Sequence, residues 1–409
     1  MEILQIAGGI TTPQGFRAAG EHLGIRKNKV KRDVALIVSD VRATAAACYT
    51  KNLVQGAPIA VTKKNVADGY AQAIICNSGN ANTCNANGIE IAEGMCALLE
   101  KQIGVPASDV IVASTGVIGQ PLSLVPFETG MGLLADALQK TPAGGSAAAE
   151  AIMTTDLTIK ETAVSFSLGG KTCMLGGAAK GSGMICPNMA TMLSFLTTDV
   201  AVAPAVLQKA LSRAVENTFN MLSVDGDTST NDMACILANG MAGNALLQNE
   251  NSEDFSVFER ALQMVCESLC RMMARDGEGA THLITCSVCG AADEAAAKTV
   301  AKSVIKSSLL KAAIFGADAN WGRVLCAVGY SGADVDVTKI DVDFSSSAGR
   351  ITVCCAGFGS PFDEEKAKQI LLEDEITIHI DLHGGKASAT AWGCDLTYDY
   401  VKINGDYRT

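Results

Sequence analysis

Glycine spacing is the feature that most limits how this chain can fold. The 40 glycines are spread along all 409 residues and divide the apolar side chains into short runs. Short apolar runs separated by glycine are typical of proteins in which strands and helices alternate and are joined by tight turns. Hydrophobic residues make up 48% of the chain, which is ample material for a buried core. We therefore expect a globular protein of the mixed α/β class.

Four segments predict this mixture by their periodicity. Residues 204–219 and 258–275 repeat apolar side chains at intervals of three and four, which predicts two helices. Residues 376–382, ITIHIDL, alternate apolar and polar side chains as a half-buried strand does. Residues 163–177 alternate on both sides of Gly169–Gly170, which predicts a β-hairpin. No linker or charge block marks a domain boundary.

Charge and composition exclude several classes of partner. A net charge of -11 argues against nucleic acid or an anionic membrane as the main partner, because both would repel this surface. No apolar stretch approaches the roughly 18 residues that a membrane span needs. The N-terminal sequence MEILQIAGGITTPQGF lacks the features of a signal peptide, and the 15 cysteines are scattered and odd in number. We expect a cytoplasmic protein with reduced thiols.

Familiar metal and nucleotide motifs are incomplete in this chain. His379 and His383 lie four apart on a predicted strand, and the segment lacks the glutamate of metalloproteases. Cys286 and Cys289 form a single CxxC without a second pair at a fitting distance. Gly170 and Lys171 resemble the end of a phosphate-binding loop but lie in the predicted hairpin. We expect no metal site and no bound cofactor.

Residues 180–199, KGSGMICPNMATMLSFLTTD, contain a more informative pattern. A glycine-rich loop that carries Lys180 runs into Ala190-Thr191 and then into an apolar run. A threonine hydroxyl needs a base beside it, and one such base is the α-amino group of the same residue after the preceding peptide bond is cut. This site needs no histidine, and the chain has only four. Taken alone, the shape of the segment favours a glycine-rich turn that enters a strand, with Thr191 in a structural role.

A second pattern occurs in residues 110–120, VIVASTGVIGQ. An apolar run ends in Ser114-Thr115-Gly116, which places a hydroxyl and an unobstructed N–H at a strand end, where they could form an oxyanion hole. The same three residues also form a common turn. Residues 77–88, 219–232 and 315–323 are dense polar loops that turn chemistry alone would explain.

Taken together and in order, these segments resemble the ornithine acetyltransferase family, also called the bifunctional glutamate N-acetyltransferase family of arginine biosynthesis. The resemblance covers nearly the whole chain. Its motifs are AGGITTPQGFRAAG, NSGNAN, STGVIG, MTTD, KGSGMICPNMATML, NTFNMLSVDGDTSTND, RDGEGAT, NWGR and INGDYRT.

The resemblance implies a self-processing enzyme. Cleavage before Thr191 would give an α chain of residues 1–190 and a β chain of residues 191–409, which begins with the nucleophile. The implied fold is one intertwined α/β unit with stacked β-sheets between helix layers, shared with self-processing aminopeptidases. The two chains are expected to stay together as an α2β2 assembly.

The resemblance also assigns residues to roles. The oxyanion pair falls on Thr115 and Gly116. The substrate contacts fall on these positions: Thr154 or Thr155, Lys180, Thr191, Glu278, Asn404 and Thr409. These types suit an amino-acid substrate, whose carboxylate Lys180 could meet and whose cationic amine Glu278 could meet. The chain departs from the family pattern at Cys186, His282 and Gly405, none of which has an assigned chemical role.

The implied reaction moves the acetyl group of N2-acetyl-L-ornithine to L-glutamate through an acetyl-threonine enzyme, with ping-pong kinetics. Nothing in the sequence decides whether acetyl-CoA also serves as acetyl donor. Two alternatives stay open. One is a self-processing peptidase with water as acceptor, and the other is an amino-acid-binding protein in which Thr191 is never exposed.

Overall fold

The computed structural model describes residues 2–186 and 192–406, which form two compact units. The first spans Met1–Gly181, Asn188–Phe219 and Thr228–Leu269, and the second spans Ser182–Pro187, Asn220–Asp227 and Cys270–Thr409. The chain passes from one unit to the other several times. Each unit therefore contains residues from both sides of position 190.

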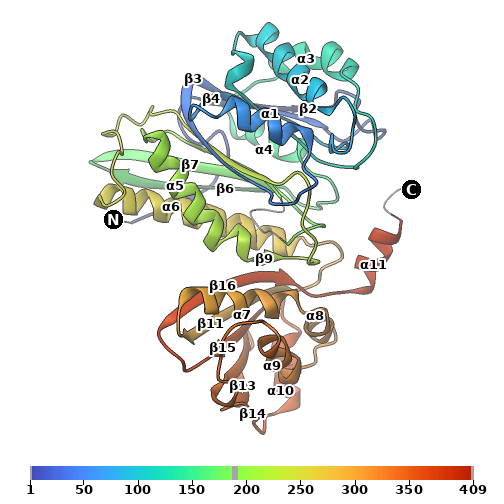
Figure 1. The fold of residues 1–409 in the computed structure, drawn as a ribbon, viewed down its shortest axis with the longest axis vertical. Helices are drawn as coiled ribbons and strands as arrows, with labels where there is room; N and C mark the ends of the chain where they lie inside the picture. Colours follow the sequence, from blue (N-terminus) through green and yellow to red (C-terminus); the bar gives the residue numbers. More distant parts are fainter. Residues whose placement is uncertain (1, 187–191, 407–409) are drawn as a thin grey trace. The chain divides into compact units, whose positions relative to one another are not determined.

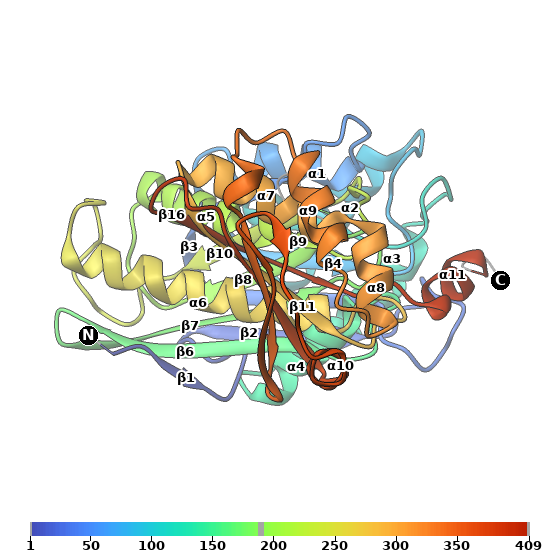
Figure 2. The same ribbon diagram turned by 90° about the horizontal axis from the view of Figure 1, so that it is seen from below.

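The strands of the first unit form a single sheet, which has nine strands within the described part of the chain. Its order is β1-β6-β7-β8-β10-β3-β4-β5, and β2 pairs with β3 off this path. Figure 2 shows β1, β6 and β7 side by side at one end of this order. The strands are β1 (Leu4–Ile6), β2 (Phe16–Glu21), β3 (Val34–Tyr49), β4 (Tyr70–Asn77), β5 (Val110–Ser114), β6 (Lys160–Leu168), β7 (Lys171–Lys180), β8 (Leu193–Thr198) and β10 (Met233–Ala238).

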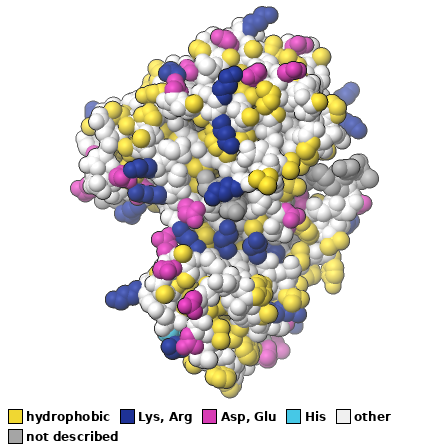
Figure 3. Space-filling model, viewed as in Figure 1, with side chains coloured by type: hydrophobic (Ala, Val, Ile, Leu, Met, Phe, Trp, Pro, Cys, Tyr) yellow, Lys and Arg dark blue, Asp and Glu magenta, His cyan; other side chains and the backbone are white. Residues whose placement is uncertain are grey.

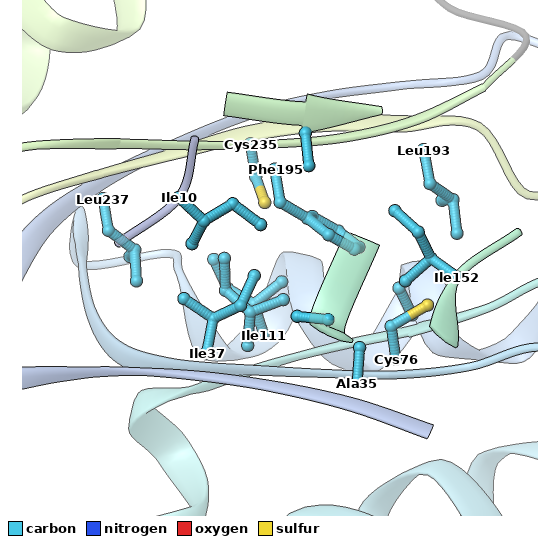
Figure 4. Packing of buried hydrophobic residues seen from close by; sticks show 14 of the residues in the cluster. Ile10, Ala35, Ile37, Cys76, Ile111, Ile152, Leu193, Phe195, Cys235 and Leu237 are labelled. Atoms are coloured by element: carbon cyan, nitrogen blue, oxygen red, sulfur yellow. The ribbon is translucent and has the colours of Figure 1, made fainter. Parts of the chain in front are cut away.

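The sheet folds back on itself at β3, which pairs with β4 and β2 through its first half and with β10 through its second half. The register of β3 against β4 shifts between Val38 and Ala43. Side chains from the two layers meet in a common core, where Phe195 and Cys235 of one layer point toward Ile37 and Ile111 of the other (Figure 4). Small residues in this core allow the layers to pack closely.

Helices cover both outer faces of the first unit (Figure 1). On one face, Met95, Leu99 and Phe127 pack against the outer side chains of β3, β4 and β5. On the other face, α5 contacts β3 and β10, and α6 approaches β7 at Gly177. The helices are α1 (Ala57–Asn65), α2 (Gly88–Ile103), α3 (Val125–Asp136), α4 (Pro142–Ala151), α5 (Pro204–Asn217) and α6 (Glu253–Arg275). The expected layering of stacked β-structure between helices is confirmed in this unit.

The second unit is built on a seven-stranded sheet, counted over the residues with described positions. Its order is β14-β13-β12-β15-β11-β16-β9, and α7 packs across β16 and β11 (Figure 1). The strands are β9 (Leu222–Ser223), β11 (Leu283–Ala291), β12 (Asp341–Ser346), β13 (Gly349–Cys355), β14 (Phe358–Gly359), β15 (Glu375–Asp381) and β16 (Ala387–Cys394). The helices are α7 (Glu294–Lys306), α8 (Ser308–Phe315), α9 (Trp321–Gly329), α10 (Glu364–Leu371) and α11 (Tyr398–Gly405).

The periodic segments of the sequence form the predicted elements. The predicted hairpin is β6 and β7, and Gly169 and Gly170 both have positive φ angles, which glycine adopts without strain. The alternating segment is β15, and the two periodic helices are α5 and α6. Helix α5 ends at Asn217 rather than continuing to Phe219, and α6 begins at Glu253, five positions earlier than its apolar pattern indicates.

Side chains of both charges are interspersed with apolar ones over the face shown in Figure 3.

Within the described segments, no helix combines the length and apolar character needed to cross a membrane.

Candidate active site

The predicted oxyanion residues lie just beyond β5, at the edge where β4 and β5 end together. These two strands are parallel, with Asn77 opposite Ser114. The Thr115 N–H donates to the Asn77 carbonyl at 2.9 Å, so the chain still follows β4 for one further residue. Thr115 and Gly116 are both half-buried. The apolar run therefore forms a strand that ends directly before Thr115 and Gly116.

Gly116 occupies a position that no other residue fits without strain. Its φ angle is +131°, and a Cβ atom there would lie 2.3 Å from the Gly79 carbonyl carbon. Two hydrogen-bond donors of this turn donate to no other described residue. The Gly116 N–H and the Thr115 hydroxyl have no hydrogen-bond partner among the described residues. An unused N–H next to an unused hydroxyl is the arrangement that a developing oxyanion requires.

A network of buried side-chain amides holds this turn. The Ser114 hydroxyl donates to Asn77 Oδ1 at 2.6 Å, and Asn77 Nδ2 donates to the Asn80 carbonyl at 2.9 Å. Asn80 Nδ2 donates in turn to the Gln120 carbonyl at 3.0 Å. Asn231, two residues before β10, joins the network, because its Nδ2 donates to the Ser114 carbonyl at 3.0 Å. Buried amides that use their donors and acceptors fully resist reorientation.

Lys180 lies at the end of β7, opposite Leu193 at the start of β8. Its side chain is buried, with 7% of the residue exposed, and its ammonium group forms no hydrogen bond or ion pair with another described residue. Burial lowers the pKa of Lys180, while the nearby Asp156 carboxylate opposes this shift. Cys76 of β4 and Asp232 also interact with it electrostatically. A buried cation of this kind suits a carboxylate ligand.

Thr154 and Thr155 are held beside this lysine by the buried Asp156 carboxylate. Asp156 Oδ2 accepts from the Thr154 N–H at 2.9 Å, and Oδ1 accepts from Lys160 Nζ at 2.7 Å and from the Gly181 N–H at 2.8 Å. Burial raises the pKa of Asp156, but the charges of Lys180 and Lys160 and these hydrogen bonds outweigh burial and lower it below the usual range. The structure thus brings together the predicted residues 154, 155 and 180.

Ala190, Thr191 and Thr409 lie outside the described residues. The residue that follows Thr191 is described, however, and its carbonyl is fixed: Met192 accepts a hydrogen bond of 3.0 Å from the Met233 N–H. Met233 comes two residues after Asn231, whose side chain binds the Ser114 carbonyl. The start of β8 is therefore connected through β10 to the turn that carries Thr115 and Gly116.

The second unit brings Glu278 and Asn404 together. Asn404 Nδ2 donates to Glu278 Oε2 at 2.7 Å, and Glu278 is buried, with 7% exposed. The Glu278 N–H donates to the Ser182 carbonyl at 2.9 Å, and Gly183 packs directly against the Glu278 carboxylate. Glu278 Oε1 has no hydrogen-bond partner in the part of the chain that the structure describes. One oxygen of this carboxylate thus remains available to a cation.

Tyr400 of α11 fixes this helix against a third segment of the same unit. Its hydroxyl donates to Asp225 Oδ2 at 3.3 Å, and Asp225 also accepts from the N–H groups of Met184 and Ile185. Burial raises the pKa of Tyr400 and that of Asp225. The Thr397 hydroxyl caps the start of α11 and donates to the Gly279 carbonyl at 2.7 Å.

The incomplete metal-binding motifs of the sequence lie in the sheet of the second unit. Cys286 is buried and Cys289 is exposed on β11, and the His379 ring shares a hydrogen bond with the Ser345 hydroxyl on the neighbouring strand. His282, one of the departures from the family pattern, lies 3.1 Å from Asp395. Across residues 2–186 and 192–406, no group of three or more His, Cys, Asp or Glu side chains is placed to hold a metal ion.

Sequence patterns did not identify three residues that hold the predicted site residues in place: Asn77, Asp156 and Asn231. Their segments were interpreted only as polar loops or as part of a motif. The run NSGNAN contains more side-chain amides than one turn needs, and this excess was the available signal for supporting residues. Buried amides must find hydrogen-bond partners on other segments. Those partners come from segments far apart in the sequence, so spacing alone could not identify them.

Comparisons with known proteins agree over the whole chain. Residues 17–409 match the model of the ArgJ family. The arginine biosynthesis bifunctional protein ArgJ of Caldanaerobacter subterraneus subsp. tengcongensis is 49% identical over 410 residues, which cover 100% of both chains. The protein of the same name from Bacillus subtilis is 44% identical and covers 100% of this chain and 98% of its own.

A solved structure is also similar to this chain. The crystal structure of arginine biosynthesis bifunctional protein argJ from Bacillus halodurans is 49% identical, with a TM-score of 0.51. The match covers 53% of this chain and 100% of the solved chain.

Proposed function

This chain belongs to the ArgJ family, and we propose that it transfers the acetyl group of N2-acetyl-L-ornithine to L-glutamate in arginine biosynthesis, yielding L-ornithine and N-acetyl-L-glutamate. It is an acyltransferase with an N-terminal nucleophile. The arrangement that supports acyl transfer most strongly is the pair formed by the Thr115 hydroxyl and the Gly116 N–H, which donate to no other described residue. The buried Lys180 adds a cation that suits a substrate carboxylate.

Thr191 is the proposed nucleophile. Its Oγ attacks the acetyl carbonyl carbon while its own α-amino group takes the hydroxyl proton. Thr115 and Gly116 stabilise the negative charge that develops on the carbonyl oxygen. The C–N bond to ornithine then breaks, and the α-amino group returns the proton to the departing nitrogen. Glutamate attacks the acetyl ester in the reverse sense and regenerates the free hydroxyl.

The remaining roles concern substrate recognition. Lys180 binds a substrate carboxylate, and Glu278 binds a cationic amine through its unused oxygen. The other proposed contacts are Thr154 or Thr155, Asn404 and Thr409. The buried position of Lys180 supports its role, because a buried cation that forms no ion pair with another described residue is stabilised when an anion binds.

Self-cleavage between Ala190 and Thr191 supplies the free amine. One observation supports the cut, and another supports the association of its products. The Bacillus halodurans chain, matched over its full length, covers little more than half of this chain, as residues 191–409 do. In addition, β7 precedes the cleavage site and β8 follows it, and the two strands are paired in one sheet. The fragments therefore remain associated after the bond is cut.

The wider setting is also part of the proposal. The enzyme acts in the cytoplasm, binds no metal or resident cofactor, and assembles as α2β2. Acetyl-CoA serves as a second acetyl donor, which gives N-acetylglutamate directly. This second activity is supported by the word "bifunctional" in the names of the relatives.

Steady-state kinetics with purified protein test the proposal. Varying N-acetylornithine at several glutamate concentrations should give parallel lines in double-reciprocal plots, because the acetyl-enzyme separates the two half-reactions. Intersecting lines contradict the covalent mechanism. Hydrolysis of aminoacyl amides without acetyl transfer would instead favour the peptidase, and ornithine binding without cleavage or turnover would favour a binding protein.

A further inference from the structure

Asn231 is a buried asparagine two residues before β10, and its side-chain amide is fully hydrogen-bonded. Its Nδ2 donates to the carbonyls of Ala81 and Ser114, at 2.6 and 3.0 Å. Its Oδ1 accepts from the hydroxyls of Thr83 and Thr230, both at 2.6 Å. A carboxamide has two donor hydrogens and two acceptor lone pairs, and all four are used here. The amide therefore has a single orientation, with its nitrogen toward the two carbonyls.

One of these bonds orients the peptide unit that leads into the oxyanion turn. The Ser114 carbonyl, which Asn231 binds, and the Thr115 N–H belong to the same peptide plane. That N–H donates to the Asn77 carbonyl at 2.9 Å. Because both ends of a planar peptide are fixed, its rotation is fixed as well. The direction of the next N–H, that of Gly116, depends on this plane.

The second carbonyl lies on the opposing side of the same turn. The Ala81 carbonyl accepts from Asn231, and the Ala81 N–H donates to the Val117 carbonyl at 3.0 Å. Asn231 thus holds Ser114, the last residue of β5, and Ala81, which follows β4, on the two sides of the Gly116 turn. Among the described residues, the Asn231 side chain bonds to Ala81, Thr83, Ser114 and Thr230 and to no proposed substrate residue, so we expect its effect on catalysis to pass through this turn.

Asn231 also lies two residues before Met233, which pairs with Leu193 of β8. Strand β8 follows Thr191 and is called the nucleophile strand here. Two residues later, the Met233 N–H donates to the carbonyl of Met192, the residue after Thr191. Three consecutive residues span at most about 10 Å of chain, so the bond to Ser114 and the bond to Met192 are near one another. Asn231 is therefore placed to fix the distance between the nucleophile strand and the oxyanion turn.

We propose that Asn231 is a positioning residue of the acyl-transfer reaction, which holds the Thr115 and Gly116 donors in register with the strand that follows the nucleophile. This inference rests on the proposed function. Oxyanion donors act only when they lie within hydrogen-bonding distance of the developing charge, and a shift of about 1 Å can cost about 100-fold in rate.

Asn231→Asp is the most informative variant, because it keeps the shape and replaces the NH2 group with an oxygen that cannot donate. Two carbonyls then face an acceptor, so the turn must shift. We expect kcat to fall about 100-fold while KM stays within about threefold. Asn239→Asp is the matched control, since Asn239 follows the other end of β10 and also donates to a backbone carbonyl, that of Gln14, at 2.8 Å. The control should keep wild-type kcat.

A double variant separates positioning from general loss of structure. If Asn231 acts through the oxyanion donors, adding Thr115→Ala to Asn231→Asp should lower kcat no further than the larger single effect within about threefold. Fully multiplicative losses would overturn the inference. Asn231→Ala removes the donor without placing an acceptor opposite the two carbonyls. Assayed below its own unfolding temperature, alone and combined with Thr115→Ala, it tests the positioning role if Asn231→Asp does not fold.

Different results would contradict the proposed function and the positioning role of Asn231. If the wild type transfers no acetyl group, the proposed function is wrong. If the wild type is active and folded Asn231→Asp or Asn231→Ala retains kcat within about threefold, the positioning role alone is wrong.

Discussion

Asn404 donates a hydrogen bond of 2.7 Å to Glu278, which lies 126 residues earlier in the chain. The bond uses Oε2 of a carboxylate that is otherwise buried, and it fixes the direction of the remaining oxygen, Oε1. Helix α11 is itself held by the Tyr400 hydroxyl on Asp225. The Glu278 carboxylate is therefore oriented before any ligand arrives, which reduces the entropy lost on binding.

Replacing Glu278 by Gln should weaken binding of the donor more than binding of the acceptor. N-acetylornithine keeps a cationic side-chain amine, whereas glutamate has no side-chain cation. We expect KM for N-acetylornithine to rise about tenfold or more, equivalent to a lost charge-assisted hydrogen bond, and KM for glutamate to change less. Initial rates with each substrate varied in turn measure this. An equal rise for both substrates would contradict the assignment of Glu278 to the amine.

Removing the Thr115 hydroxyl should slow the chemical steps without changing affinity. Thr115→Val keeps the shape of the side chain and removes the donor, so kcat should fall about 100- to 1,000-fold with KM nearly unchanged. Thr129→Val on the exposed surface of α3 is the control and should retain wild-type rates. A Thr115→Val enzyme with wild-type kcat would exclude this hydroxyl from the oxyanion hole.

Gly116→Ala should destabilise the protein more than an equivalent change nearby. The added Cβ would meet the Gly79 backbone at 2.3 Å, in a backbone conformation that L residues rarely adopt. Gly119 also has a positive φ angle, but a Cβ there would meet nothing within 4 Å. We expect a loss of about 1 kcal/mol in the free energy of unfolding for Gly119→Ala, from strain alone. The loss for Gly116→Ala should exceed it in denaturant titrations, and equal losses would show that the turn relaxes freely.

The stability contribution of Asp156 should depend on pH in a defined direction. Its pKa is lowered in the folded protein from the ordinary value of 3.8, so its contribution is present above that pH and is lost as the pH falls through the folded pKa. Asp156→Asn should cost about 3 kcal/mol at neutral pH, because the charge opposite Lys160 is removed.

The same comparison across pH provides the check. The difference in free energy of unfolding between wild type and Asp156→Asn should stay constant from neutral pH to about pH 5 and shrink below about pH 4. A difference that grew on acidification would mean that the carboxylate is not stabilised in its charged form.

Sequence periodicity was sufficient to predict individual strands and helices, but it did not predict how the chain divides into two compact units. The β6–β7 hairpin, β15 and the two periodic helices each have a pattern confined to a single element, so a contiguous segment predicts them. The two units are different, because residues 182–187 and 220–227 belong with the C-terminal part of the chain. A boundary that the chain crosses repeatedly leaves no linker to detect.

The candidate site divides in the same way. Thr115 and Gly116 could be singled out because a strand ends beside them, and Lys180 because it begins a glycine-rich loop. The environment of each was not predictable. The bonds of Asn231 reach Ala81 and Ser114, 150 and 117 residues away, and no periodicity connects such positions. Glu278 and Asn404 were identified only through the family resemblance, and the structure supplies the bond that joins them.

Mass spectrometry of the denatured protein after incubation with N-acetylornithine alone shows whether the chain is cut and whether the fragment that begins with Thr191 carries the acetyl group. We expect two fragments, one of residues 1–190 and one of residues 191–409, with the second heavier by one acetyl group. Addition of glutamate should return that fragment to its original mass, and Thr191→Ala should remain a single chain without the adduct. A single uncut wild-type chain, or a cut chain that turns over without ever carrying acetyl on the second fragment, would contradict the account.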